Sequence, residues 1–377
     1  MSGAPPDGAS PGTPEEAAAA AAEEVVRGTG GTHHTGVLSG IGRRIGRRLL
    51  SSLPAILGVV VLTFLLMRVL PGDPAVFFAS GPSAGQEEIE ALRRDLGLDK
   101  PIPVQLLRYL GDVATGNLGR SLTTGQPVVT DLRQRLPASL ELTLCALLIA
   151  LSLAVPLGIL AALRPGSPVD HAVRFVCTLG VCVPTFVSGL LLIYVFYYLL
   201  GWAPDPTGRI DIFAATPPDI TGFLLVDFAI TGNWEGWWSA AMQLLLPACT
   251  MALFVLAPLA RMTRASMLAV LGSDFVRTAR SVGLPRWRVV VVYALRNALL
   301  PVLTIAGIVF STMLGANVLV EKVFSWPGVA SYALDALLSS DYAPVQGFVL
   351  LMASIFVLVN LLVDILYGIA DPRVSME

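Results

Sequence analysis

Residues Leu142 to Leu163 read LTLCALLIALSLAVPLGILAAL, a run without a single charged side chain. A helix needs about 20 mostly apolar residues to cross the hydrocarbon core of a bilayer, so this run is long enough to span a membrane. The runs are continuously apolar rather than alternating, which favours helices over a barrel. The sequence therefore predicts an all-α polytopic membrane protein with six transmembrane helices. The other five charge-free runs are Leu49 to Met67, Phe175 to Pro204, Gly236 to Ala260, Asn297 to Val320 and Tyr342 to Val363.

The composition excludes several other classes of protein. The chain has 377 residues, and its charged share of 14% is well below the roughly 25% of a typical soluble domain. A soluble multidomain chain, a disordered chain, a collagen and a secreted disulfide scaffold are all inconsistent with it. Neither a redox motif nor a metal site is predicted, because no Cys-x-x-Cys pair occurs and the three histidines do not form a ligand pattern. The four cysteines all lie in apolar stretches: Cys145, Cys177, Cys182 and Cys249.

Arginines set the expected orientation of the helices. Four arginines precede the first run, and the loop between the fourth and fifth runs is the most basic part of the chain. Positive charge collects on the cytoplasmic side, so both termini are expected in the cytoplasm. Residues 1–40 are rich in Ala, Gly, Pro, Glu and Thr and are predicted to form a disordered cytoplasmic tail. Residues 41–377 form the transmembrane domain, with an extracytoplasmic loop over 71–136 and a cytoplasmic loop over 261–297.

The cytoplasmic loop 261–297 contains a short amphipathic pattern. Ser273 can cap the start of a helix, Gly283 ends it, and Pro285 prevents its continuation. Two interpretations are open for this helix: it lies on anionic lipid as a basic topology signal, or it is presented to a cytosolic partner. The apolar side chains that share its one face are Phe275, Val276, Ala279 and Val282.

This loop resembles the permease subunits of ATP-binding-cassette (ABC) importers. Arg277-Thr278-Ala279, followed after three residues by Gly283, is similar to the Glu-Ala-Ala-x-x-x-Gly loop of those permeases. The departures at Arg277 and Thr278 are common in the dipeptide, oligopeptide and nickel branch. The resemblance covers roughly Arg43 to Val374. Further segments resemble the same branch, in the same order: Leu70 to Pro74, Gly116 to Ser121, Leu136 to Leu142, and Asn360 to Asp364 with Asp371 to Arg373.

The resemblance implies a type I importer permease that forms half of a translocation pathway in the bacterial inner membrane. Its implied partners are a second homologous permease, two cytosolic ABC ATPases that bind ATP and Mg²⁺, and an extracytoplasmic substrate-binding protein. It implies no cofactor and no nucleic acid bound by this chain. Dipeptides or oligopeptides are the expected substrates, while glutathione, nickel complexes and sugars stay open. The implied ATPase-coupling residues are Asp274, Phe275, Arg277, Thr278, Ala279, Arg280, Val282 and Gly283.

Other classes of function fit the sequence less well. Lys100 and Lys322 are the only lysines and neither follows a glycine, so the chain has no Walker A loop and is not expected to be an enzyme. A membrane-embedded serine protease would need a histidine within a span, and no span has one. The alternative is an ion-coupled secondary transporter, which usually carries ionisable residues inside the membrane. The six runs contain none, and the charged Glu141, Arg68 and Asp364 lie only at helix ends.

Overall fold

The computed structural model describes residues 33–69, 75–76, 85–95, 97–211 and 216–370. These residues form helices joined by loops, and among them the only β pairing is a single bridge between Arg120 and Pro127. The chain divides into two compact units, Met1–Ser51 and Ser52–Glu377. The predicted all-α class is confirmed. The description of the larger unit follows.

Five helices within the described part of the chain are long and apolar enough to cross a membrane, and a bent pair raises the number to six. Each of the six predicted runs lies mainly in one of these helices or in the bent pair, although the third run continues past Leu199 to Pro204 and the fifth past Ala316 to Val320. The polytopic architecture with up to six spans is therefore confirmed. The spans are α2 (His33–Val69, apolar from Leu50), α6 (Val128–Leu163), the bent pair, α10 (Trp234–Leu271), η2 (Arg288–Ala294) with α12 (Leu295–Ala316), and α15 (Tyr342–Ala370, apolar to Leu366).

Several helices extend beyond their apolar runs. Helix α6 begins at Val128 and not near Leu142, and α10 continues to Leu271, eleven residues after the predicted end at Ala260. A helix of 36 residues is about 54 Å long, well over the roughly 30 Å of the hydrocarbon core. The polar turns beyond the core therefore belong to the predicted loops 71–136 and 261–297, which are partly helical. Their helical conformation continues because elongation adds one hydrogen bond per residue.

The N-terminal boundary also differs from the prediction. Helix α2 begins at His33, inside the predicted tail of residues 1–40, while residues 1–32 lie outside the described part. Leu70 to Pro74 and Asp371 to Arg373, which carry part of the family resemblance, also lie outside it.

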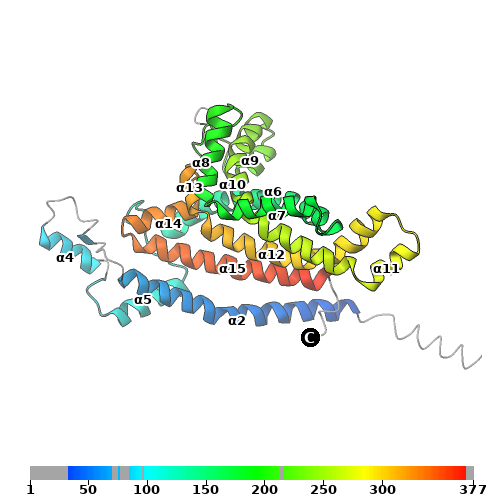
Figure 1. Cartoon of the computed structure of the whole chain (residues 1–377). Helices are drawn as coiled ribbons and strands as arrows, with labels where there is room; N and C mark the ends of the chain where they lie inside the picture. Colours follow the sequence, from blue (N-terminus) through cyan, green and yellow to red (C-terminus); the bar gives the residue numbers. More distant parts are fainter. Residues whose placement is uncertain (1–32, 70–74, 77–84, 96, 212–215, 371–377) are drawn as a thin grey trace, which may run out of the picture. The chain divides into compact units, whose positions relative to one another are not determined.

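The third predicted span, Phe175 to Pro204, is not one straight helix. Helix α7 (Pro168–Cys182) and the pair α8 (Thr185–Leu192) and η1 (Ile193–Leu199) meet at 102°. Figure 1 shows α8 standing away from α7. The bend falls at Val183, whose backbone is extended (φ −90°, ψ 125°) because Pro184 disfavours a helical residue before it. The third predicted span is therefore a bent pair of helices, which is either a broken span or a re-entrant loop.

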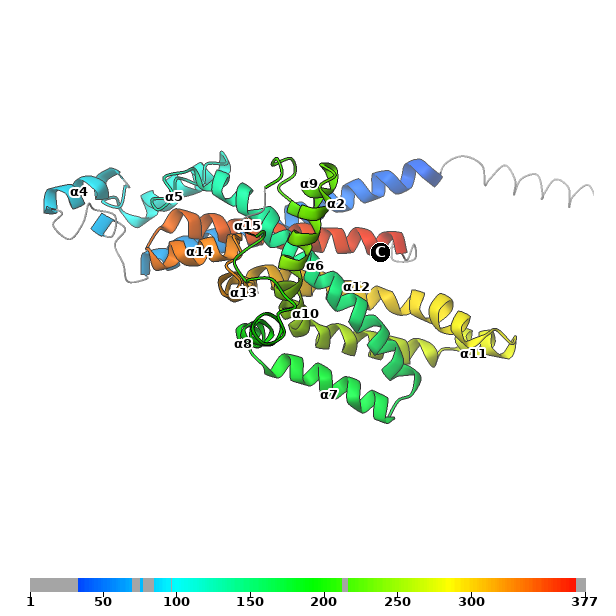
Figure 2. The same cartoon turned by 90° about the horizontal axis from the view of Figure 1, so that it is seen from above.

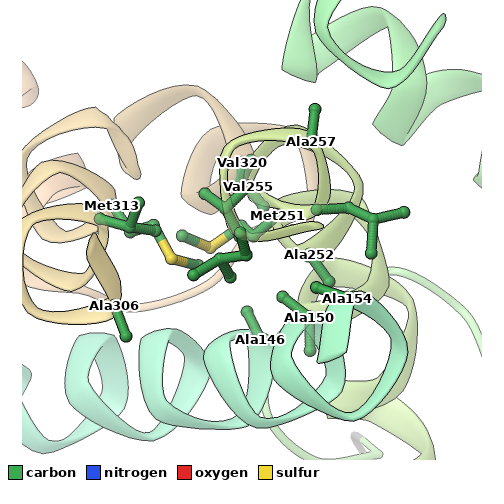
Figure 3. Packing of buried hydrophobic residues seen from close by; sticks show 14 of the residues in the cluster. Ala146, Ala150, Ala154, Met251, Ala252, Val255, Ala257, Ala306, Met313 and Val320 are labelled. Atoms are coloured by element: carbon green, nitrogen blue, oxygen red, sulfur yellow. The ribbon is translucent and has the colours of Figure 1, made fainter. Parts of the chain in front are cut away.

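The long helices pack through small residues. Figure 3 shows Ala146, Ala150 and Ala154 of α6 facing Met251 and its neighbours on α10. Small side chains at this four-residue spacing let two helix backbones approach closely, which is how membrane helices gain contact without a hydrophobic driving force. A Cβ on Gly158 would lie 2.6 Å from the Cβ of Thr263, so the approach continues one turn further along α6.

Short helices occupy the two ends of the bundle. Helix α11 (Asp274–Ser281) lies at one end, and α13 (Val318–Val323) with α14 (Val329–Leu338) lies towards the other in both views (Figures 1 and 2). The loop 71–136 contains the short helix α4 (Gln86–Asp95), and Gly97 follows it with a φ of +67°. The remaining helices are α5 (Ile102–Ala114) and α9 (Leu224–Ile230).

Candidate functional site

The predicted amphipathic helix of the coupling loop is confirmed as α11, Asp274–Ser281. At its end, the N–H of Gly283 donates to the Arg280 carbonyl (3.0 Å) and the N–H of Leu284 donates to the Ala279 carbonyl (3.3 Å). This pair of bonds is a Schellman motif, which needs a left-handed residue directly after the helix. Gly283 has a φ of +81° and supplies it. The Ser273 hydroxyl, by contrast, caps no N–H of the helix and donates to the Val270 carbonyl.

The apolar face of α11 divides into a buried and an exposed part. Val276 and Ala279 are buried in a cluster that includes Met267 of α10 and Val289 of η2. Phe275 is 44% exposed and Val282 is 74% exposed. The predicted apolar face thus has two buried and two exposed positions. The buried pair anchors the helix to α10 and η2, while the exposed pair presents apolar surface at the end of the bundle.

Basic and aromatic side chains surround the exposed apolar pair. Arg277 contacts Asp274 at 3.2 Å, but both side chains are largely solvent-exposed, so this ion pair contributes little to stability. Thr278 and Arg280 are exposed as well, and beyond Gly283 the exposed Trp287 lies under the guanidinium of Arg288. The exposed surface of the loop is thus positively charged with apolar points of contact.

Helix α10, which leads into the loop, also forms an ion pair with α7. The guanidinium of Arg264 donates to both oxygens of Asp170, at 2.7 and 2.8 Å. Asp170 is buried, and it also accepts from the N–H of Gly166 (3.0 Å), which closes the turn between α6 and α7. Two parallel N–H···O bonds fix both the distance and the orientation of the partners. Helix α10 is therefore held to the start of α7 about two turns before its own C-terminal end at Leu271.

A buried carboxylate fixes the opposite end of the bundle. Glu321 accepts from the Ser139 hydroxyl (2.6 Å) and from the N–H of Ser331 (2.7 Å), and the Ser139 oxygen accepts from the N–H of Val329 (2.9 Å). These bonds tie α13 and α14 to α6. Burial raises the pKa of Glu321, although the hydrogen bonds from Ser139 and Ser331 oppose the shift.

Sequence reasoning missed these two buried carboxylates. Asp170 had one local signal, since Ser167 accepts from its N–H (3.3 Å) in the Ser-x-x-Asp pattern of a capped helix start. Glu321 had none, because its partner Ser139 lies 182 residues away in the sequence. Within the described residues, no group of three or more His, Cys, Asp or Glu side chains is placed to hold a metal ion.

A bundle of up to six apolar spans with a basic loop helix at one end defines a polytopic membrane protein of the permease class. The chain belongs to the family described as "binding-protein-dependent transport system inner membrane component", whose sequence model matches residues 154–376. The model of the N-terminal membrane component of the same systems matches residues 42–143. The chain is therefore a multi-pass inner-membrane permease of a binding-protein-dependent ABC importer, a transport component that functions with partner subunits. This family leaves the ion-coupled alternative without support.

Curated relatives cover most of the chain. It is 46% identical over 334 residues to the di/tripeptide transport system permease protein DppB of Pseudomonas aeruginosa, covering 88% of this chain and 98% of that protein. It is 42% identical over 318 residues to the probable D,D-dipeptide transport system permease protein DdpB of Escherichia coli K12, covering 84% and 93%. It is 41% identical over 331 residues to the dipeptide transport system permease protein DppB of that strain, covering 87% and 97%.

Proposed function

We propose that this chain is one of two homologous permease subunits of an ATP-driven importer of dipeptides. The relatives named for dipeptide or di/tripeptide transport support this substrate class, because each aligns over nearly its whole length. In the proposed assembly, an extracytoplasmic binding protein delivers the peptide, and two cytosolic ABC ATPases bind ATP and Mg²⁺. Both termini and the loop 261–297 then lie on the cytoplasmic side.

The proposed contact with an ATPase is the exposed half of α11. The observation that carries it is the division of this helix into an anchored and an exposed side: Val276 and Ala279 are buried, and Phe275 and Val282 are not. A helix packed firmly on α10 and η2 moves with them, so a partner that pushes its exposed side can shift both spans. The chain thereby couples the closing of the ATPases to the opening of the pathway.

Gly283 provides the test of this coupling role. No atom lies within 4 Å of the position that its Cβ would take, so a substitution meets no steric clash and only the left-handed backbone resists it. That conformation costs an L-residue roughly 1–2 kcal/mol, and asparagine tolerates it best. Gly283→Ala and Gly283→Leu should therefore behave alike, and Gly283→Asn should be milder.

The measurement is the number of ATP molecules hydrolysed per dipeptide taken up by the reconstituted importer in proteoliposomes. We expect that ratio to rise about fivefold to thirtyfold for the alanine and leucine variants, as a strained loop of this free energy implies, with insertion and assembly unchanged. Gly272→Ala is the matched control, because Gly272 lies in the same loop with an ordinary φ of −84° and room for a Cβ. Normal coupling in Gly283→Leu would exclude α11 as the coupling element.

A further inference from the structure

A cavity of about 860 Å³ lies beside the first turns of α6. Its walls come from three parts of the chain: α6 from Val129 to Leu140, the loop of residues 219–223, and α15 at Leu350, Leu351 and Ser354. The volume falls within the range of roughly 300–1,000 Å³ that is usual for small-molecule sites. Most of the lining is apolar, with a few charged and polar groups among it, which is the usual composition of such sites.

The loop wall of this cavity is held in place by two buried carboxylates. Asp227 accepts from the N–H of Thr221 (2.9 Å), its hydroxyl (2.6 Å) and the N–H of Gly222 (3.1 Å). Arg209 donates to the Gly222 carbonyl (3.2 Å) and to Glu141 of α6. The hydrogen bonds from Thr221 and Gly222 to Asp227 outweigh the effect of burial, so the pKa of Asp227 lies below its usual value. The wall is thus preformed, which lowers the entropic cost of binding a ligand.

Two opposite charges that line the cavity have no such partner. Arg133 and Asp219 are both solvent-exposed and form no hydrogen bond or ion pair within the described residues, whereas the neighbouring buried carboxylates of Asp131 and Glu141 are both hydrogen-bonded. The Cβ position of Gly222 lies 3.8 Å from Asp219 Oδ1 and 2.9 Å from Pro137 Cγ. The carboxylate of Asp219 therefore lies near Pro137, one helical turn after Arg133.

Arg133 of α6 and Asp219 of the loop both line this cavity. A dipeptide with free termini carries an ammonium and a carboxylate at its two ends, and two extended residues span at most about 7 Å. The guanidinium of an arginine binds a carboxylate through two parallel hydrogen bonds, and a carboxylate accepts from an ammonium. The two charges thus match the ends of a short peptide in sign.

We propose that this cavity is a peptide-binding site of the permease, with Arg133 holding the C-terminal carboxylate and Asp219 the N-terminal ammonium of a dipeptide. The peptide's side chains lie against apolar walls such as Phe223 and Leu351. The site rests on the proposed dipeptide import and adds a binding step within the membrane subunit itself. It selects for free termini independently of the binding protein.

The test is photo-crosslinking on the assembled importer without its binding protein, so that only the membrane subunits select. The probe is a dipeptide of alanine and photoleucine at millimolar concentration. We expect adducts on residues 129–140, 219–223 and 350–354, reduced about tenfold by Arg133→Gln or Asp219→Asn and less by Arg133→Lys, since a charged hydrogen bond is lost in each. Arg108→Gln and Asp205→Asn remove exposed charges elsewhere and should leave the yield unchanged.

Competition with blocked peptides separates binding from structural damage. The C-terminal amide of the probe should compete poorly in the wild-type importer, and this discrimination should vanish in Arg133→Gln. N-acetylation should show the same pattern for Asp219→Asn. Adducts outside the cavity, or equal competition by free and blocked peptides, would overturn the site while ATP-dependent dipeptide uptake persists. If the complete wild-type importer takes up no dipeptide, the proposed function fails and the peptide site fails with it.

Discussion

Glu321 is a fully buried carboxylate that links three helices through Ser139 and Ser331. Burial raises its folded-state pKa above the usual 4.5. A raised folded pKa stabilises the protein at pH values below the unfolded pKa, and this contribution is lost as the pH rises through the folded pKa. Glu321 therefore makes the folded protein less stable towards neutral pH than in mild acid.

Glu321→Gln replaces the ionisable carboxyl group with a neutral amide, so the variant releases no proton at this position between mild acid and neutral pH. The measurement is the apparent unfolding temperature in detergent between pH 4.5 and 8. As the pH rises, the unfolding temperature of the variant should increase relative to that of the wild type. Only the difference between the two curves is used, since other groups titrate as well. Glu235→Gln is the control, because Glu235 is exposed at the start of α10. Parallel curves for wild type and Glu321→Gln would contradict the raised pKa.

Local sequence signals were sufficient for residues whose role is local. Gly283 was expected to end a helix, and it does so with a positive φ. The capping role of Ser273 was wrong because its hydroxyl donates to the Val270 carbonyl of α10. The partners of Asp170 and Glu321 could not be predicted, since they lie 94 and 182 residues away and depend on how α6, α7, α10 and α13 pack.

At the scale of helices, one ion pair joins α7 to α10 in addition to the apolar packing of Val173 and Cys177. Asp170 is buried and bound by both donors of Arg264, whereas Arg174 approaches it only to 3.7 Å with half of its side chain exposed. Removing one member of a buried pair leaves the other charge uncompensated, which costs roughly 3 kcal/mol or more. An exposed pair contributes about 0–1 kcal/mol.

Asp170→Asn should therefore lower the apparent unfolding temperature of the permease clearly, and Arg174→Gln should change it little. The double variant Asp170→Asn with Arg264→Gln should lose less than the sum of the two single changes, because the second removes the unpaired charge. Thermal unfolding in detergent gives the unfolding temperatures of Asp170→Asn, Arg174→Gln, Arg264→Gln and the double variant. Equal losses for Asp170→Asn and Arg174→Gln would show that the bidentate contact does not hold α7 to α10.

The presence of each helix could be predicted from hydropathy, but its length and straightness could not. All six apolar runs are largely helical, because apolar residues in lipid must satisfy their backbone groups internally. A span predicted from hydropathy ends at the first charged residue, so the prediction missed the polar turns of α6 before Glu141 and of α10 after Arg261. The bend at Val183 had a visible cause in Pro184, but whether a proline kinks a helix or breaks it depends on the packing around it.

For the whole molecule, the broken third span decides the topology. Between Pro165 and Ser281, the candidate spans among the described residues are the α7–η1 pair and α10. If the bent pair crosses the membrane, the two positions are on the same side, and Thr207 is on the other. If the pair is a re-entrant loop, α10 is the single crossing and the two positions are on opposite sides. The arginines near both positions favour the same, cytoplasmic side.

Single cysteines at these three positions test the arrangement, in a chain whose native cysteines at 145, 177, 182 and 249 are replaced by alanine. All three positions are exposed, so each is accessible to a membrane-impermeant maleimide. In spheroplasts we expect Thr207→Cys to react at once, and Pro165→Cys and Ser281→Cys only after permeabilisation. Uptake of dipeptide by the cysteine-free chain is the control for native folding. Reaction of Ser281→Cys from outside would make α7–η1 re-entrant and would remove α11 from the reach of any cytosolic ATPase.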